Sequence, residues 1–273
     1  MSDRKVLFLD LDGTIVGHDQ RVPESSLRAL ASARERGHVL VMCTGRSKPE
    51  IYPFLWDLGF AGAVTGAGGY VLLGDEVLID RRVGADTIRA VTDVWLEVGG
   101  MWIWQSPDEM NPSPGFMDYF LEMAGLAPND WEPYARSIGP YLKDGLPERS
   151  AKCTAYLPSE RTTYDAIRRA IPGDLDVTPG SVPAGSTVVV EVTPTDISKG
   201  TGVRLIAERL GAPLEDTIAF GDSMNDLPAL EAAGTSIAMG GCAPELAAAA
   251  DFVTGRFEEG GLAAAFARLG LSD

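Results

Sequence analysis

The chain has 273 residues, 45% of them hydrophobic and 23% charged, which is typical of a globular protein with one large domain or two modest ones. Its formal net charge of -16 argues against binding to nucleic acid or to an anionic membrane. No stretch approaches the ~20 apolar residues needed to cross a bilayer, and no signal-peptide core is found. The odd number of scattered cysteines, Cys43, Cys153 and Cys242, favours a reducing cytoplasm over a disulfide framework.

A short apolar stretch, Val6 to Leu9, runs directly into two carboxylates, Asp10 and Asp12. An apolar run of this length is typical of an interior strand of a parallel sheet, buried on both faces. Such sheets present their chemistry just beyond the carboxyl ends of their strands, which is where Asp10 falls. The alternative for this motif alone is a surface turn, because Asp and Gly are common turn residues.

The following residues are predicted to alternate between helices and strands. A helix is predicted over 23–36 and a buried strand over 38–43, which ends at Thr44 and Gly45. A further strand is predicted over 61–65. This alternation is typical of a doubly wound α/β domain with a parallel sheet.

The pattern changes after residue 70, where a β-hairpin is predicted to precede a separate α+β module at 84–189. Within that module, 126–149 has no clear period. The alternation of strands and helices returns with a strand-like stretch at 188–192 and continues to the end of the chain. We therefore predict that an inserted module divides a catalytic core formed by residues 1–83 and 190–273.

Four polar clusters fall where one α/β sheet would bring them together, and three of them directly follow an apolar strand. The clusters are Asp10 with Asp12, Thr44, Lys199, and Asp222 with Asn225 and Asp226. Oxygen-only ligands at this density suit Mg²⁺, a hard cation held by carboxylates, waters and substrate phosphate. The clusters therefore indicate a Mg²⁺ site that could support phosphoryl transfer.

Phosphoryl transfer needs a nucleophile and a proton donor for the leaving group. Asp10 could be the nucleophile and form an aspartyl-phosphate. Asp12, two residues further on, could protonate the departing alcohol and later activate the hydrolytic water.

The remaining polar residues could hold the phosphate and the metal ion. Thr44 offers a hydroxyl donor, and Lys199 offers a point charge to the phosphate. Asp222 would complete the metal site and Asp226 would assist. Asn225 both donates and accepts hydrogen bonds, so it could orient Asp10 or Lys199.

Four motifs of the sequence resemble those of the haloacid dehalogenase superfamily, in the same order and with similarly wide spacing. They are DLDGT at 10–14, TGR at 44–46, the lysine of SKG at 198–200, and GDSMND at 221–226. With a module inserted between the second and third motifs, the chain resembles the Cof-type phosphatases that carry a C2B cap. The resemblance implies a Rossmann-like core and a cap that determines substrate specificity.

The resemblance also implies Mg²⁺-dependent hydrolysis of a phosphate ester, here of a small metabolite such as a sugar phosphate. It implies that Asp10 is the nucleophile and that Asp12 is the acid/base and a metal ligand through its backbone. We predict phosphate binding by Thr44, Gly45, Lys199 and Asn225, and metal binding by Asp10, Asp12, Asp222 and Asp226. We expect a cytoplasmic monomer or homodimer with no nucleic-acid or membrane partner.

One departure from the family pattern concerns Ala67-Gly68-Gly69, where members of this branch often have Asn-Gly-Ala. The missing amide puts in doubt a substrate or phosphate contact near this turn. Three other functions remain open: a phosphomutase, which would require a bisphosphate activator, a non-enzymatic phosphate sensor, and a receiver-like module phosphorylated on aspartate. Asp12 and the inserted module disfavour the receiver, because Asp12 would promote loss of the phosphoryl group.

Overall fold

The structure is a computed structural model that describes residues 4–17, 19–124, 128–180 and 187–272, without the side chains of 123–124 and 128–131. Contacts between residues divide the chain into two compact units, which we call the core and the insert. The core comprises Met1–Gly45, Phe54–Ile79 and Ile197–Asp273, and the insert comprises Arg46–Pro53 and Asp80–Asp196.

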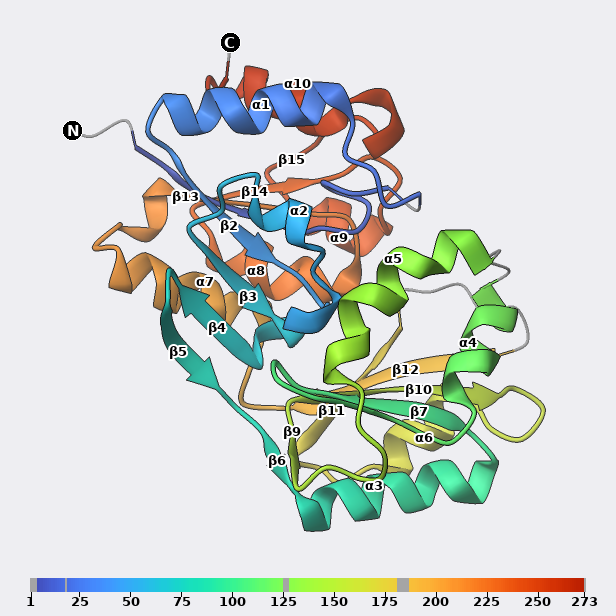
Figure 1. Cartoon of the computed structure of the whole chain (residues 1–273). Coiled ribbons are helices and arrows are strands. Elements are labelled where there is room, and N and C mark those ends of the chain that lie inside the picture. Colours follow the sequence, from blue (N-terminus) through green and yellow to red (C-terminus); the bar gives the residue numbers. More distant parts are fainter. Residues whose placement is uncertain (1–3, 18, 125–127, 181–186, 273) are drawn as a thin grey trace. The chain divides into compact units, whose positions relative to one another are not determined.

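The core is built on a predominantly parallel sheet (Figure 1). Over the described residues its strand order is β15-β14-β13-β1-β2-β3-β4-β5, with β1 at the centre and β4 antiparallel to β3. The strands are β1 (Val6–Leu9), β2 (Val39–Cys43), β3 (Gly62–Thr65), β4 (Tyr70–Leu73), β5 (Glu76–Asp80), β13 (Thr217–Gly221), β14 (Thr235–Ala238) and β15 (Phe252–Val253). Because β1 and its two neighbours are buried along their length, their apolar sequences carry no alternation.

Helices cover both faces of the core sheet. On one face, Phe8 of β1 lies in a cluster with Val203, Ile206 and Leu230 from the helices. On the other face, Phe220 of β13 contacts Phe266, with 5.3 Å between the ring centroids. The helices are α1 (Glu24–Glu35), α2 (Pro53–Trp56), α7 (Lys199–Arg209), α8 (Leu227–Ala232), α9 (Pro244–Ala249) and α10 (Gly261–Arg268). Figure 1 shows α1 beside α10, on the opposite side of the sheet from α7, which confirms the doubly wound α/β fold.

The insert has a separate antiparallel sheet, ordered β11-β12-β10-β7-β8 over the described residues, and a short pair formed by β6 and β9. Its strands are β6 (Val83–Gly84), β7 (Met101–Gln105), β8 (Met110–Pro112), β9 (Arg149–Ser150), β10 (Lys152–Pro158), β11 (Leu175–Pro179) and β12 (Thr187–Pro194). Its helices are α3 (Ala85–Val98), α4 (Phe116–Ala124), α5 (Pro128–Ile138) and α6 (Tyr164–Ala170).

Alternate residues of the insert's strands enter two apolar clusters, as expected for a sheet that is covered on both faces. Trp102 and Trp104 pack with Trp95 of α3. Ile103, between the two tryptophans, packs instead with Phe116 of α4 and Ile138 of α5. The tryptophans of β7 therefore fill a core and are not displayed on the surface.

Three expectations about the insert need correction. The strand predicted at 188–192 to return the chain to the core is β12, which pairs with β10 and β11 of the insert. The insert therefore continues to Asp196 instead of ending at 189. At the other end the insert begins at Asp80 instead of 84 and also includes Arg46–Pro53. The region 126–149, for which the sequence shows no clear period and no helix was predicted, contains α5, with Pro133 inside the helix.

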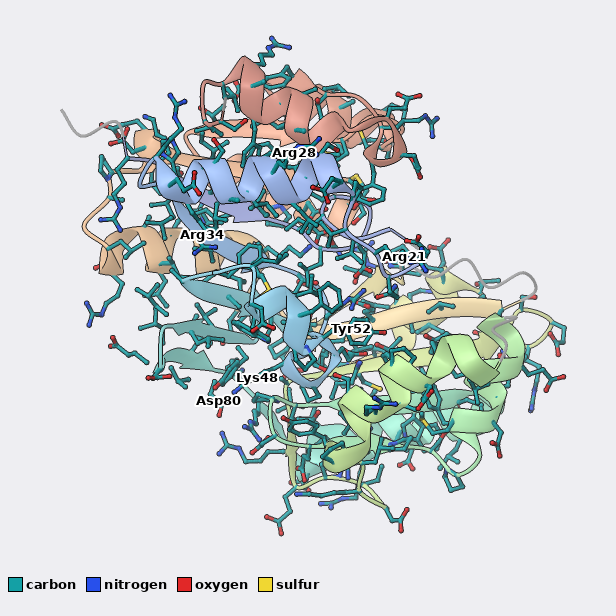
Figure 2. The ribbon with its side chains drawn as sticks, turned by 45° about the horizontal axis from the view of Figure 1, so that its top comes forward. Arg21, Arg28, Arg34, Lys48, Tyr52 and Asp80 are labelled. Carbon is teal, nitrogen blue, oxygen red and sulfur yellow. The ribbon has the colours of Figure 1, made fainter. Side chains whose placement is uncertain are left out.

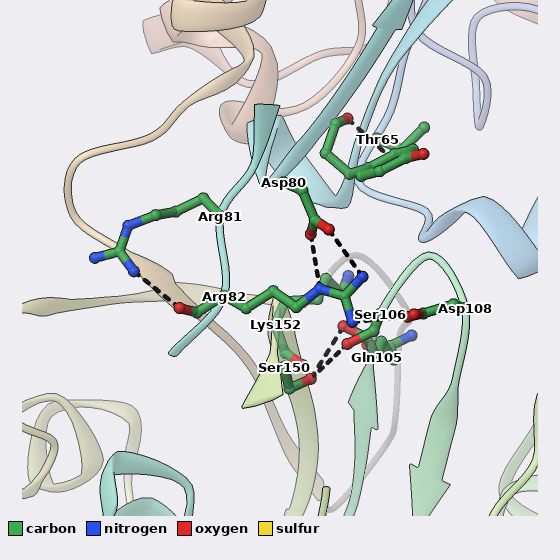
Figure 3. A network of polar contacts seen from close by, with 10 residues as sticks. Thr65, Asp80, Arg81, Arg82, Gln105, Ser106, Asp108, Ser150 and Lys152 are labelled. Carbon is green, nitrogen blue, oxygen red and sulfur yellow. Dashed lines mark hydrogen bonds and ion pairs between the residues drawn. The ribbon is translucent and has the colours of Figure 1, made fainter. Parts of the chain in front are cut away.

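Ion pairs hold the two ends of the insert's main segment together. Arg81 Nε lies 2.9 Å from the carboxylate of Asp196, the last residue of the insert. Arg82 reaches Asp80 at 2.7 Å and Asp108 at 2.8 Å, and Figure 3 shows its guanidinium between these residues. The Arg82 side chain is only 13% exposed, so this forked contact is better shielded from solvent than the exposed Arg81 pair.

Candidate active site

The predicted site residues come together at one edge of the core sheet. Asp10 follows β1, Thr44 follows β2, and Asp222 follows β13. Because β1 pairs in parallel with β13 on one side and β2 on the other, the three strand ends are adjacent. Lys199 reaches the same place as the first residue of α7. The topology therefore gathers the four sequence clusters.

Lys199 is the centre of this cluster. Its side chain is fully buried, and Nζ donates hydrogen bonds to Asp10 Oδ1 at 2.8 Å and to Asn225 Oδ1 at 2.9 Å. A third, short bond goes to Asp226 Oδ1. The three donors of an ammonium group are thus fully used, and the positive charge is compensated by two carboxylates.

Asp226 organises the loop that carries Asp222. One carboxylate oxygen, Oδ2, accepts hydrogen bonds from the backbone N–H groups of Asp222 and Ser223, each at 3.0 Å. The other oxygen accepts the bond from Lys199. Ser223 Oγ donates to Asn225 Oδ1 at 3.0 Å. Both oxygens of Asp226 are therefore engaged within the protein, and Ser223 supports the loop in a way that sequence reasoning missed.

The carboxylates of Asp10, Asp222 and Asp226 form an acidic group that could hold a metal ion, since one ligand atom of each lies within 4.8 Å of the others. An all-oxygen set at a partly open position fits a hard divalent cation such as Mg²⁺. Asp222 is the most exposed of the three, and Asp226 is only 1% exposed. The donor set is compatible with a metal held directly by Asp10 and Asp222, with Asp226 behind them.

Asp12 lies in the same loop as Asp10, but its side chain is exposed and outside the acidic group. The loop closes on itself because the N–H groups of Ile15 and Val16 both donate to the Leu11 carbonyl oxygen at 2.8 Å. Gly13 has a φ of +76°, and a Cβ there would lie 2.2 Å from Asp222 Oδ2. Glycine is therefore required at this point for the Asp12 loop and the Asp222 loop to approach each other.

Burial and like charges alter the acidity of the site. Burial first, and then the neighbouring carboxylate of Asp226, raises the pKa of Asp10 well above its ordinary value, while Lys199 opposes this effect. The same two causes raise the pKa of Asp222 to about 7. The carboxylates of Asp10 and Asp226 keep the pKa of Lys199 above its ordinary value despite its burial. In the metal-free chain the lysine is therefore charged and the acidic group holds protons readily.

Cys43 precedes Thr44 but does not have the properties of a nucleophile. The residue is buried in the core cluster, and burial raises the pKa of its thiol far above the ordinary value. A buried neutral thiol behaves as a small apolar side chain.

The turn at Ala67-Gly68-Gly69 supports the site through its backbone. Ala67 N–H donates to the Thr44 carbonyl oxygen at 3.2 Å, in a left-handed conformation with φ of +55°. Gly68 has a φ of +109° and lies so close to Ser198 that a Cβ would be 2.3 Å from its carbonyl oxygen. This turn therefore fixes both Thr44 and the residue before Lys199, a role that the comparison with Asn-Gly-Ala did not anticipate.

The parallel sheet and its strand-end carboxylates, next to a buried lysine, define an α/β protein with the site arrangement that the four motifs predict. The model of the haloacid dehalogenase-like hydrolase family matches residues 7–266, and the chain belongs to that family. The prediction of a hydrolase of this superfamily is confirmed.

Relatives and solved structures match this chain over nearly its whole length. Bacillus subtilis (strain 168) YkrA, provisionally named a phosphatase, is 29% identical over 98% of this chain and 99% of its own length. A phosphoglycolate phosphatase of Methanothermobacter thermautotrophicus is 26% identical over 97% of this chain and 98% of its own. The structure of the subclass IIB sugar phosphatase BT4131 has a TM-score of 0.78 at 24% identity, covering 98% of this chain and 99% of that one, which shows the shared fold.

None of the helices within the described ranges combines the length and apolar character needed to cross a membrane.

Proposed function

We propose that this protein is a Mg²⁺-dependent phosphatase that hydrolyses a small phosphorylated metabolite, such as a sugar phosphate, through an aspartyl-phosphate on Asp10. The observation that carries the proposal is the buried contact between Lys199 and Asp10, which places a fixed positive charge beside a carboxylate at a strand end. A transferring phosphoryl group needs this pairing of an anionic nucleophile with a cation for its oxygens. The phosphatase names of the full-length relatives support the same reaction class.

In the proposed reaction, a carboxylate oxygen of Asp10 forms a bond to phosphorus while the bond from phosphorus to the substrate's ester oxygen breaks. Asp12 donates its proton to that oxygen, so the organic product leaves as an alcohol. Asp12, now ionised, takes a proton from water as the water oxygen attacks phosphorus. Inorganic phosphate leaves, and Asp10 returns as a carboxylate. The exposed position of Asp12 suits a group that exchanges protons with substrate and water.

The phosphate would be held by Thr44, Gly45, Lys199 and Asn225. Lys199 supplies charge, and Thr44, whose N–H donates to the Val64 carbonyl oxygen at 2.8 Å, offers a hydroxyl on a fixed backbone. Asn225 already accepts a hydrogen bond from Lys199, so it orients the lysine as well as offering its own amide.

The metal ion would be held by Asp10 and Asp222 directly, by Asp12 through its backbone, and by Asp226 in support. When bound, Mg²⁺ would neutralise charge on the phosphoryl oxygens and on the acidic group. Burial, and then the neighbouring charge of Asp226, raises the pKa of Asp10 and of Asp222, and this supports a cation at the acidic group, since a cation would favour the ionised carboxylates.

We assign substrate selection to the insert, as the predicted cap at 84–189 implies. The insert has its own sheet and apolar clusters, so its surface can vary without disturbing the strand ends that carry the chemistry. A sugar phosphate is the proposed substrate class. The names of two relatives, phosphoglycolate phosphatase and pyridoxal phosphate phosphatase, indicate which other compounds belong in a test panel.

The test is phosphate release from sugar phosphates, phosphoglycolate, pyridoxal phosphate, nucleotides and p-nitrophenyl phosphate, with Mg²⁺ and with EDTA. We expect Mg²⁺-dependent turnover with a preference for one sugar phosphate. Tight binding of a phosphorylated ligand without turnover would instead identify a sensor. Transfer that requires a bisphosphate activator would identify a phosphomutase.

A further inference from the structure

The segment that follows the proposed phosphate-binding turn does not belong to the core. Thr44 and Gly45 end the first core segment, whereas Arg46–Pro53 belongs to the insert by its contacts. This segment, which we call the phosphate-turn extension, contains the short helix η1 (Lys48–Glu50), which packs against α5. Labels at Lys48 and Tyr52 mark its position in Figure 2. A direct peptide bond thus joins Gly45 of the core to a segment held by the insert.

Two hydroxyl groups of α5 hold the phosphate-turn extension. Tyr134 Oη donates to Glu50 Oε1 at 2.9 Å. One helical turn further on, Ser137 Oγ donates to the Pro49 carbonyl oxygen at 2.7 Å. The residues lie three positions apart, so both hydroxyls project from one face of the helix toward η1.

Glu50 also contacts the residues between η1 and Gly45. Its second carboxylate oxygen, Oε2, accepts from Ser47 N–H at 2.8 Å and from Ser47 Oγ at 2.7 Å, closing a capping box. Its carbonyl oxygen accepts from Arg46 Nη1 at 3.0 Å. A single residue therefore connects α5 to the two residues that directly follow Gly45.

The hydrogen bond from Tyr134 to Glu50 does not depend on ionisation of the tyrosine near neutral pH. Burial first, and then the negative charge of Glu50, raises the pKa of the Tyr134 hydroxyl well above its ordinary value, so it stays a donor. The bond runs from a hydroxyl to a carboxylate, which makes it stronger than a bond between neutral groups. The Arg46 guanidinium is near enough to oppose the shift, and it also lies over the Tyr52 ring at 5.4 Å.

We propose that Tyr134 and Ser137 are positioning residues for phosphate binding: through Glu50 and Pro49 they fix the phosphate-turn extension and so the orientation of Thr44 and Gly45. This inference rests on the proposed function, and it assigns to α5 a role that is independent of the substrate's organic part. The alternative is that Tyr134 reads the organic part of the substrate. The two roles predict different patterns of kinetic change.

The test compares Tyr134→Phe, Ser137→Ala and Glu50→Gln with the wild type, in the full-length Mg²⁺-loaded protein. The readouts are the inhibition constant of inorganic phosphate and the KM and kcat of three substrates with unlike organic parts. We expect the inhibition constant to rise by about 10-fold in Tyr134→Phe, as for a lost charge-assisted hydrogen bond. KM should rise by the same factor for every substrate.

Tyr164→Phe is the matched control, because its hydroxyl donates to the Val177 carbonyl oxygen at 2.6 Å elsewhere in the insert. It should leave the phosphate inhibition constant unchanged. A Tyr134→Phe protein with unchanged phosphate inhibition would overturn the proposal, whether its KM values were unaltered or altered for some substrates only.

A double mutant tests whether Tyr134 acts through Glu50. Combining Tyr134→Phe with Glu50→Gln should give the same inhibition constant as Glu50→Gln alone. Both substitutions remove the same contact between Tyr134 and Glu50, so their effects should not add. Additive effects would contradict the proposed route. A wild type that turns over no phosphate ester refutes the proposed function, whereas an active wild type with unaffected variants refutes only this inference.

Discussion

Lys199 and Asp10 lie 189 positions apart in the sequence, yet Lys199 Nζ donates a hydrogen bond of 2.8 Å to Asp10 Oδ1. Both side chains are nearly inaccessible to solvent, at 0% and 6% exposure. Burial of a carboxylate favours its neutral form, and the lysine opposes this without overcoming it. Lys199, and any further positive charge at the site, therefore favours the ionised form of the proposed nucleophile.

Replacing the lysine by an apolar residue of similar length, in Lys199→Met, should abolish turnover and destabilise the fold. The buried carboxylates of Asp10 and Asp226 would lose their shared counter-ion, and breaking such a buried pair costs about 3 kcal/mol. Urea unfolding with and without Mg²⁺ measures the change, and Mg²⁺ should restore part of the loss. The control is Lys5→Met, whose partner Asp216 is partly exposed and whose cost should stay below about 1 kcal/mol.

Asp226→Asn should weaken metal binding more than it lowers kcat at saturating Mg²⁺. One Asp226 oxygen accepts from the N–H groups of Asp222 and Ser223 and the other accepts from Lys199, so the NH₂ of an amide would face one of these donors. The Mg²⁺ concentration for half-maximal activity should rise about 10-fold, the equivalent of one lost charge-assisted bond. An unchanged Mg²⁺ dependence with normal folding would show that Asp226 has no influence on the position of Asp222.

The acidity of Asp222 predicts how the metal-free protein responds to pH. Its folded-state pKa is raised to about 7 from an ordinary value of 3.8, so the folded state binds the proton more tightly than the unfolded state. The resulting stabilisation is fully present below about pH 4 and is lost as the pH rises to about 7. Unfolding measured across this window should show a decline that is smaller in Asp222→Asn, where the raised pKa of Asp10 still contributes.

Mg²⁺ should reverse this pH dependence. A metal ion competes with the proton for the carboxylate, so Mg²⁺ affinity should increase up to about pH 7 and then level off. Calorimetric titrations in buffers of different ionisation enthalpy would detect the released proton at pH 6. Binding without proton release at that pH would contradict a raised pKa for the acidic group.

Gly68→Ala should be strongly destabilising, because it adds a clash to an unfavourable backbone angle. The φ of +109° disfavours any side chain, and the new Cβ would meet the Ser198 carbonyl oxygen at 2.3 Å. Since Ser198 precedes Lys199, activity should fall together with stability. Gly74→Ala is the control: its φ of +58° gives backbone strain of about 1 kcal/mol, with no atom within 4 Å of the new Cβ. Equal losses of stability in the two variants would contradict this account.

The sequence predicted the location of the candidate site because the candidate residues directly follow strand ends in the chain. Asp10, Thr44 and Asp222 each follow an apolar strand, and parallel pairing then brings those ends together. Their roles in catalysis and binding remain predictions.

Other features depend on contacts that no local pattern reveals. The stretch of β12 is as apolar as a core strand, and only its antiparallel partners assign it to the insert. Pro133 lies inside α5, and an internal proline is normally a sign of a helix end, so the sequence did not predict this helix. Ser223 and the close approach of Gly68 to Ser198 involve small residues whose importance comes from one neighbour in space. The engaged oxygens of Asp226 likewise follow from tertiary geometry.

The most direct test of the central claim is to trap the phosphorylated protein. Rapid acid quenching of the wild type turning over a good substrate with Mg²⁺, followed by borohydride reduction and peptide mass spectrometry, should convert Asp10 alone to homoserine. Asp10→Asn should show no such product and lose turnover by about 10³-fold or more. Modification at another residue, or normal turnover in a folded Asp10→Asn protein, would contradict the assignment of Asp10 as the nucleophile.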